Sequence, residues 1–205
     1  MILSSTVLTN NSPEGGLMKT AYEVAQFFLY HAHDGEKDQI SHLKLQKLLY
    51  YAQGYSLAFL DRPIFDEPIE CWQHGPVVKT IYHAYKHYGR KPIPPAMVNL
   101  QVFSNEEVIV LSCVANEYGQ HSAWKLRNMT HCEEPWRLAK SEYCSDIPIE
   151  SIKRYFKDKL EMPEVRDDNH AYQYDVGAMQ ASIDSGAVRV PELQSDDDFI
   201  AWLNA

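Results

Sequence analysis

The chain has 205 residues, 45% of them hydrophobic and 23% charged, which is typical of a folded domain and excludes a mainly disordered chain. Its formal net charge of -9 comes from 19 basic and 28 acidic side chains, which argues against a basic domain that neutralises nucleic-acid phosphates. The charge is uneven, because residues 161–205 contain 10 acidic and 2 basic side chains while residues 1–160 are nearly neutral.

The sequence has no run of about 18 apolar residues that would predict a membrane span. Residues 1–17 lack a positively charged start and contain Asn-Asn-Ser-Pro-Glu-Gly-Gly, so they are interpreted as a flexible leader rather than a signal peptide. We therefore expect a cytoplasmic protein. The cysteines at 71, 113, 132 and 144 are widely spaced, which favours reduced, mostly buried thiols over disulfides or a zinc site.

Two helices are predicted in the first 60 residues. The first begins at Thr20, which can form a capping box with Glu23, and ends near residue 34. The second begins after Ser41, and Lys47 is expected on the flank of its apolar face. That face comprises Leu45, Leu48, Leu49, Ala52, Tyr55 and Phe59.

A change of period after Pro63 predicts a β-hairpin. Its strands are expected at Ile64-Phe65 and at Ile69 to Trp72, joined by an acidic turn. Gly75-Pro76 is expected to open a third helix, because proline is tolerated where the first N–H has no partner. Gly89 would end that helix.

The remaining elements up to residue 160 are also mostly helical. A short strand is expected over residues 98–102, and Ser104 with Glu107 forms a second capping box for a helix that ends at Gly119. Further helices are predicted over residues 122–129, from Pro135-Trp136 onward, and over residues 149–160.

The predicted fold class is mainly α: a compact helical domain over residues 18–160 with a small β-hairpin element. An acidic extension, residues 161–205, follows it. The extension is expected to end in a short helix capped by Ser195, with Asp196 to Asp198 favourably placed against the helix dipole.

No catalytic, cofactor-binding or metal-binding site is predicted. His83 and His87 have the spacing of two metal ligands but lack the glutamate of the metalloprotease motif, so aromatic packing is favoured. His131-Cys132 places a base beside a thiol, but nucleophilic pairs are assembled in space rather than by adjacency. Core packing is favoured over base stacking for the tryptophans Trp72, Trp124 and Trp136.

Four separate blocks of the sequence resemble the Panacea antitoxin domain family, also called phage-associated GepA-like or SocA-like proteins. The blocks are Ile40 to Gly54, Phe65 to Trp72, Gly75 to Val78, and Thr130-His131 with Pro135-Trp136. The family-motif positions that carry over are Leu45, Lys47, Leu48, Tyr50, Tyr51, Trp72, Gly75, Pro76, Val77, His131, Pro135 and Trp136.

The resemblance implies a mostly helical, non-catalytic antitoxin from bacteria or their prophages, whose partner is a protein toxin encoded by an adjacent gene. Neutralisation by direct binding is the leading hypothesis; the alternative is an adaptor that delivers the toxin to an ATP-dependent protease. Most motif positions are interpreted as structural. His131 is expected to cap or hydrogen-bond a helix end, with a direct partner contact as the alternative.

The acidic extension lies outside the family pattern and is the candidate contact for a basic toxin surface. The candidate partner-binding residues are Asp196, Asp197, Asp198, Phe199, Ile200, Trp202 and Leu203. Alternatively, the terminal helix folds back on its own domain. Neither a nucleic acid nor a membrane is expected as a direct partner, and the oligomeric state is left open.

Overall fold

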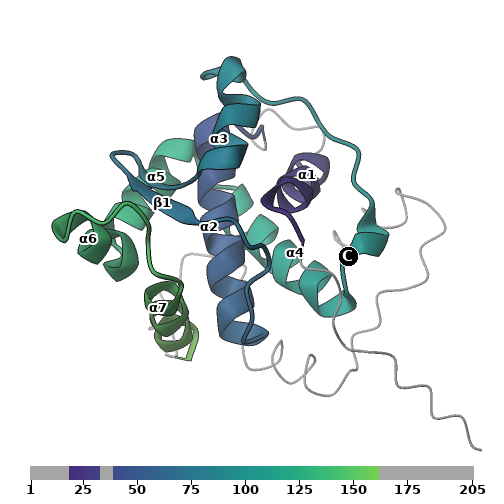
Figure 1. Ribbon diagram of the computed structural model, residues 1–205. Coiled ribbons are helices and arrows are strands. Elements are labelled where there is room, and N and C mark those ends of the chain that lie inside the picture. Colours follow the sequence, from purple (N-terminus) through teal and green to yellow (C-terminus); the bar gives the residue numbers. More distant parts are fainter. Residues whose placement is uncertain (1–18, 33–38, 162–205) are drawn as a thin grey trace, which may run out of the picture.

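The computed structural model describes residues 19–32 and 39–161, which form a mostly helical body with one small hairpin (Figure 1). The predicted fold class is thereby confirmed. The elements are α1 (Ala21–His31), α2 (His42–Phe59), β1 (Ile69–Trp72), β2 (Gly75–Val78), α3 (Lys79–Tyr85), α4 (Asn105–Gly119), α5 (Ala123–Cys132), α6 (Glu134–Ser141) and α7 (Ile149–Glu161). Two 3-10 turns, η1 (Lys86–Tyr88) and η2 (Leu100–Val102), complete the set within these residues.

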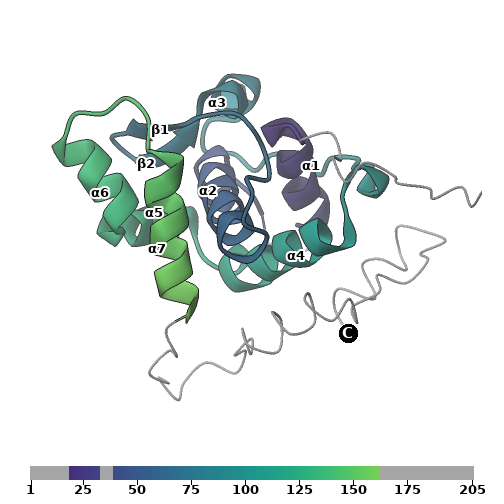
Figure 2. The same cartoon turned by 60° about the horizontal axis from the view of Figure 1, so that its bottom comes forward.

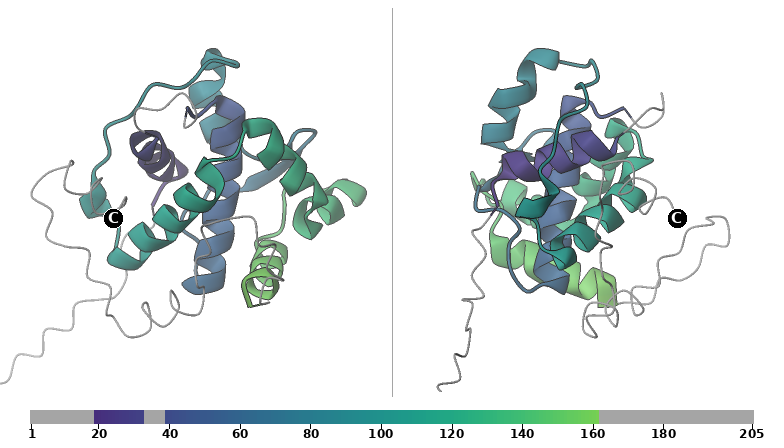
Figure 3. Two further views of the ribbon diagram at one scale, coloured as in Figure 1. Left: turned by 180° about the vertical axis from the view of Figure 1, so that it is seen from behind. Right: turned by 90° about the vertical axis from the view of Figure 1, so that its right-hand side faces the viewer.

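Helix α2 runs through the centre of the body. Helices α1 and α4 lie on one side of it and α6 and α7 on the other (Figures 1 and 2), and α4 and α5 cover its back (Figure 3). Every residue from 44 to 57 is buried, including the polar ones. A helix buried all round has no solvent face, so its polar side chains must find partners inside the protein.

Side-chain caps fix the helix starts where the sequence predicts them. Thr20 and Ser104 each form a complete capping box, with Glu23 and Glu107 respectively. Ser41 caps α2 by accepting a hydrogen bond from the N–H of Lys44. Each cap satisfies backbone donors that the first helical turn leaves without partners.

The hairpin differs from the prediction. Its strands are β1 and β2, paired antiparallel with Trp72 opposite Gly75, so the Gly75-Pro76 step is strand and not the start of a helix. Pro76 lies opposite Cys71, whose N–H is donated to Ser145 O, so the proline removes no hydrogen bond of the strand pair. Gly75 has φ +97°, a conformation that glycine adopts at no cost.

The short strand predicted over residues 98–102 is also wrong. Leu100–Val102 is the 3-10 turn η2, in which Asn99 Oδ1 accepts a hydrogen bond from the N–H of Gln101. The alternating apolar residues had suggested a strand, but the asparagine side chain stabilises a turn instead.

Helix α1 ends at His31, with Ala32 as its C-cap, earlier than the predicted end near residue 34. Several predictions fall outside the described residues: the leader, and nearly all of the acidic extension with its terminal helix and the candidate contacts from Asp196 to Leu203. Within the described part of the chain, no helix is both long and apolar enough to cross a membrane. The four cysteines are free. Three are partly buried and Cys132 is exposed, so the expected burial of most thiols is wrong.

Candidate functional site

The family-motif residues meet where α2, the hairpin, α5 and the start of α6 pack together. The five motif residues of α2 are fully buried, and the hairpin residues Gly75, Pro76 and Val77 are buried against that helix. Trp72 is partly buried on β1, His131 lies in the last turn of α5, and Pro135 and Trp136 form the first turn of α6. Most of the motif therefore forms the interior.

Lys47 lies at the centre of this interior, not on the flank of α2 where its spacing had placed it. Its side chain is fully buried, and Nζ donates a hydrogen bond to the Pro76 carbonyl oxygen at 2.8 Å. A Cβ atom on Gly75 would lie 2.8 Å from Nζ and 2.9 Å from Thr130 Oγ1. Burial, and then the nearby charge of Arg127, lowers the Lys47 pKa to about 7. Glycine at position 75 is thus what lets the amine reach the strand.

Two glutamines of α2 hold the backbone of neighbouring segments, a role that the sequence interpretation missed. Gln46 Oε1 accepts a hydrogen bond from the N–H of Val78 at 2.7 Å. Gln53 donates to Phe65 O and accepts from the N–H of Ile64. The signal for them was two polar residues seven positions apart, hence on one face, inside an otherwise apolar helix.

A second polar cluster, also missed, joins α2, α4, α7 and the segment before α6. Glu133 Oε1 accepts hydrogen bonds from Tyr51 Oη and from Lys159 Nζ, both at 3.3 Å. Lys159 Nζ also donates to Tyr118 Oη and lies 5.5 to 5.9 Å from the centroids of four rings, Tyr51, Tyr118, Tyr155 and Phe156. Burial raises the pKa of the Glu133 carboxyl, opposed by the charge of Lys159.

His131 and Trp136 fix the corner between α5 and α6. Their rings stack with centroids 3.8 Å apart, and Trp136 Nε1 donates a hydrogen bond to Trp72 O at 3.1 Å. Burial lowers the His131 pKa to about 4, so the imidazole is neutral at pH 7. The hydrogen bond expected from His131 to a helix end is not formed by its Nε2, which is buried without a partner; ring stacking holds this residue instead.

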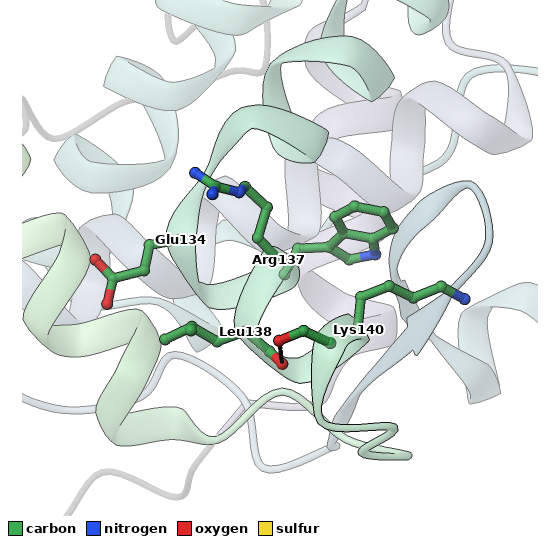
Figure 4. A pocket seen from close by; sticks show the side chains of 6 residues that line it. Glu134, Arg137, Leu138 and Lys140 are labelled. Carbon is green, nitrogen blue, oxygen red and sulfur yellow. Dashed lines mark hydrogen bonds between the residues drawn. The ribbon is translucent and has the colours of Figure 1, made fainter.

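The outer surface of α6 carries an open hollow of about 570 Å³ (Figure 4). It is lined by Glu134, Trp136, Arg137, Leu138, Lys140 and Ser141. Leu138 and Lys140 point to opposite sides of the helix. Four of the large hydrophobic side chains exposed in the described residues lie between the start of α5 and the start of α7, namely Trp124, Leu138, Tyr143 and Ile149. Of these four, Leu138 lines the hollow. Exposed apolar side chains that lie together are typical of a protein-binding surface.

The other candidate residues are not assembled into a site. His83 and His87 lie on different elements, α3 and η1, and their rings pack against Tyr82 and Tyr88. No group of three or more metal-ligating side chains gathers in the part of the chain that the structure describes. Of the tryptophans, Trp136 packs in the core, whereas Trp124 is 59% exposed and contradicts the expectation of core packing.

Comparison with known proteins finds a similarity over part of this chain. Residues 45–137 match the family described as Antitoxin SocA-like, Panacea domain. Antitoxin SocA of Caulobacter vibrioides (strain NA1000 / CB15N) is 37% identical over 71 residues, which are 35% of this chain and 38% of that protein. The similarity thus spans well under half of this curated relative, and no solved structure gives a significant match. The resemblance inferred from the four sequence blocks is confirmed, and residues 45–137 include all the motif positions.

Proposed function

We propose that this chain, whose residues 45–137 match the SocA-like Panacea domain, is a cytoplasmic antitoxin that neutralises a cognate protein toxin by binding it directly. The family match is the observation that carries the proposal. The antitoxin acts by association rather than by catalysis, and its toxin is the product of the adjacent gene.

The burial of the motif supports two different roles for parts of the domain. Lys47, Gly75 and the His131–Trp136 stack build the interior and fix the orientation of α6. Leu138, 40% exposed, and Tyr143, 96% exposed, lie on the outer surface that this interior supports. We therefore assign the body, residues 18–160, as a scaffold whose α6 surface contacts the toxin.

The acidic extension, residues 161–205, supplies a second contact in this proposal. Its net charge of -8 would attract a toxin whose site binds phosphate groups and is therefore basic, and would speed the association. Phe199 and Trp202 would add the desolvated aromatic contacts that long-range charge attraction does not provide.

Coexpression with the neighbouring gene tests the function. The full chain should restore growth of cells that express this gene product, and the two proteins should copurify. Deletion of residues 165–205 should abolish protection and leave a folded body. If the chain gives no protection, or if protection is unchanged by the deletion, the corresponding part of the proposal is wrong.

Two surface variants locate the contact on the body. Leu138→Asp combined with Tyr143→Ala should weaken toxin binding by about tenfold or more, because apolar contacts at interface centres contribute most of the affinity. Met97→Asp is the matched control, because Met97 is 79% exposed and lies outside α6 and its connections. Equal toxin affinity of the two variants would contradict the assignment of the α6 surface.

A further inference from the structure

Four basic side chains converge where α5 and α2 meet the turn of the hairpin. Arg127 and His131 are four residues apart on α5 and therefore lie on one face of that helix. His74 lies in the turn between β1 and β2, and a Cβ on the next residue, Gly75, would lie 2.8 Å from Nζ of Lys47 on α2. The hairpin turn and the buried amine are thus in close contact. Arg127, His131, His74 and Lys47 are called the cationic cluster below.

The cationic cluster has no carboxylate partner within residues 19–32 and 39–161. Lys47 Nζ donates to a backbone carbonyl oxygen and Arg127 Nη1 donates to Asn128 Oδ1, and none of the four members forms an ion pair in these ranges. Arg127 Nε and His131 Nε2 are buried without a hydrogen-bond partner. Because buried polar atoms are nearly always hydrogen-bonded, two such nitrogens on one helix face favour a ligand that accepts hydrogen bonds.

The members of the cluster also act on one another electrostatically. Burial, and then the charge of Arg127, lowers the Lys47 pKa to about 7. Burial lowers the His131 pKa to about 4, and the charges of neighbouring basic side chains, Arg127 first and then Lys47, lower it further. Like charges held together disfavour their own ionised forms. An anion bound among them has the opposite effect, because it raises the pKa of each basic group that it approaches.

An exposed aromatic ring adjoins the cluster. Trp124 lies one turn before Arg127 on α5 and is 59% exposed. The guanidinium carbon of Arg127 lies 5.1 Å from the centroid of the indole ring, so a cation–π contact holds the arginine beside it. Base stacking was disfavoured for this tryptophan because no basic residues are interleaved with the tryptophans in the sequence; the fold supplies them. An open indole next to a phosphate-binding arginine suits a nucleobase.

We propose that the cationic cluster binds a phosphate group, whose oxygens accept hydrogen bonds from the Arg127 guanidinium and the His74 imidazole while the charge of buried Lys47 attracts it from within the domain. Donors that approach from two elements, α5 and the hairpin turn, match a tetrahedral oxyanion better than a planar carboxylate with two oxygens. The phosphate is either free or part of a nucleotide whose base stacks on Trp124. Binding needs no toxin, so the proposal is independent of the proposed function.

Calorimetric titration of the full chain at pH 7 tests the site with inorganic phosphate, adenosine monophosphate and adenosine. We expect one-to-one binding of the two phosphate-bearing probes, with Kd values of about 1 mM or below, and no binding of adenosine. If the ligand is a nucleotide, adenosine monophosphate binds about tenfold more tightly than phosphate, and Trp124→Ala removes the difference. Equal affinities would assign the site to the phosphate group alone.

Single variants separate the cluster from general surface charge. Arg127→Met should weaken phosphate binding about tenfold, because it removes a charge-assisted contact. His74→Ala should weaken it about threefold through the loss of one hydrogen bond. Lys125→Met is the matched control, because Lys125 is an exposed cation of the same helix on a different face and should leave the affinity unchanged. His74 is also exposed, so its variant should keep the helical circular dichroism.

Proton uptake gives a readout of the buried amine. Sulfate is the probe, because it has the shape of phosphate but does not titrate near neutral pH. At pH 8 most Lys47 amines are neutral in the folded protein, so sulfate binding should transfer a fraction of a proton to Lys47. The uptake is measured from the binding heat in buffers of different ionisation enthalpy. Lys47→Met should abolish it, whereas binding to unrelated surface cations would not depend on Lys47.

Three results would each overturn the proposal. They are the absence of saturable binding of both inorganic phosphate and adenosine monophosphate, equal phosphate affinity of Arg127→Met and Lys125→Met, and equal proton uptake by the wild type and Lys47→Met. Failure of the coexpression assay would leave these measurements unaffected, because they use the purified chain alone.

Discussion

Lys47 and Lys159 both carry an ammonium group into the body, but their surroundings differ. Lys47 is fully buried and bonds to a backbone carbonyl, with no carboxylate partner in the described residues. Lys159 keeps 27% of its side chain exposed and meets a buried carboxylate and four aromatic rings. The first site binds a near-neutral amine, whereas the second binds a cation.

The difference shows how two contacts between elements of one domain are built. The Lys47 joint is the contact of Lys47 on α2 with Pro76 on β2, and the second joint is the contact of Lys159 on α7 with Glu133. The Lys47 contact depends on the close approach of the amine to strand β2, because the amine fits only where Gly75 lacks a side chain. The Lys159 contact depends on charge, because Glu133 is 5% exposed and needs a cation to remain ionised. The predictions that follow perturb one joint at a time, from the largest expected effect to the smallest.

Gly75→Ala should damage the Lys47 joint most. The new Cβ would meet Lys47 Nζ and Thr130 Oγ1 within 3 Å at a positive φ, so we expect a loss of about 3 to 4 kcal/mol in unfolding free energy. Gly89→Ala is the control, because Gly89 also has a positive φ but no atom within 4 Å of the added Cβ. It should cost less, about 2 kcal/mol, from the backbone strain of alanine at φ +57° and ψ -117° alone. Equal losses in urea denaturation would mean that backbone strain alone explains position 75.

Lys159→Met should damage the second joint by leaving the Glu133 carboxylate without its cation. We expect a loss of about 2 to 3 kcal/mol at pH 7, less than for a fully buried pair because Lys159 is partly exposed. Lys153 lies on the same helix as Lys159 and forms a surface ion pair with Asp61, which follows α2. Lys153→Met should therefore cost about 0.5 kcal/mol or less.

The Lys159→Met loss should shrink on acidification. The pKa of Glu133 is raised in the folded protein, and without Lys159 it rises further, so the folded state binds a proton more tightly than the unfolded state. Stability relative to the wild type should therefore recover as the pH falls from 7 to 5. A loss that does not depend on pH would show that the aromatic contacts, and not the carboxylate, hold Lys159.

Lys47 should make stability rise with pH. Its pKa is about 7 in the folded protein and 10.5 in its unperturbed state, so between these values the unfolded state binds more protons and alkaline pH favours folding. Lys47 should therefore raise the unfolding free energy by about 2 kcal/mol between pH 7 and 9. The difference in unfolding free energy between the wild type and Lys47→Met isolates this contribution from those of the other titrating groups. If urea denaturation gives the wild type and Lys47→Met the same pH dependence of unfolding free energy, burial does not lower the Lys47 pKa and the amine is in contact with water.

Tyr51→Phe separates the hydroxyl from the ring at the second joint. The variant loses the hydrogen bond to Glu133 but keeps the stacking on Tyr118, whose centroid is 3.7 Å away. We expect a loss of about 1 kcal/mol by thermal or chemical unfolding. A loss as large as that of Lys159→Met would show that the tyrosine hydroxyl, rather than the cation, carries the joint.

Local patterns predicted the helices and only part of what connects them. The capping boxes at Thr20 and Ser104 lie at the helix starts because a cap acts within four residues. The hairpin was misplaced because Gly75-Pro76 suits both a helix start and a strand that needs no N–H at that position. Local sequence does not distinguish these two settings; the partner strand and Lys47 do.

The candidate site divides in the same way. The motif blocks carried the resemblance to the family, but the grouping of Lys47 with Gly75 and Thr130, and of Glu133 with Lys159, joins segments far apart in the chain. Trp124 and Trp136 are both aromatic residues near the start of a helix, yet one is exposed and the other packs on His131. Burial of this kind depends on neighbouring elements that periodicity does not specify.

The sequence by itself determined the helical class, the capped helix starts, the family resemblance and the concentration of acidic charge after residue 160. These features depend on residue type and on spacings of a few residues. Only the tertiary structure decided that α2 is buried all round, that Lys47 is an interior amine, and that α6 presents an open hollow lined in part by Arg137 and Lys140. The reason is that burial, pKa and surface shape depend on what packs against a residue, and the packing partners come from distant parts of the chain.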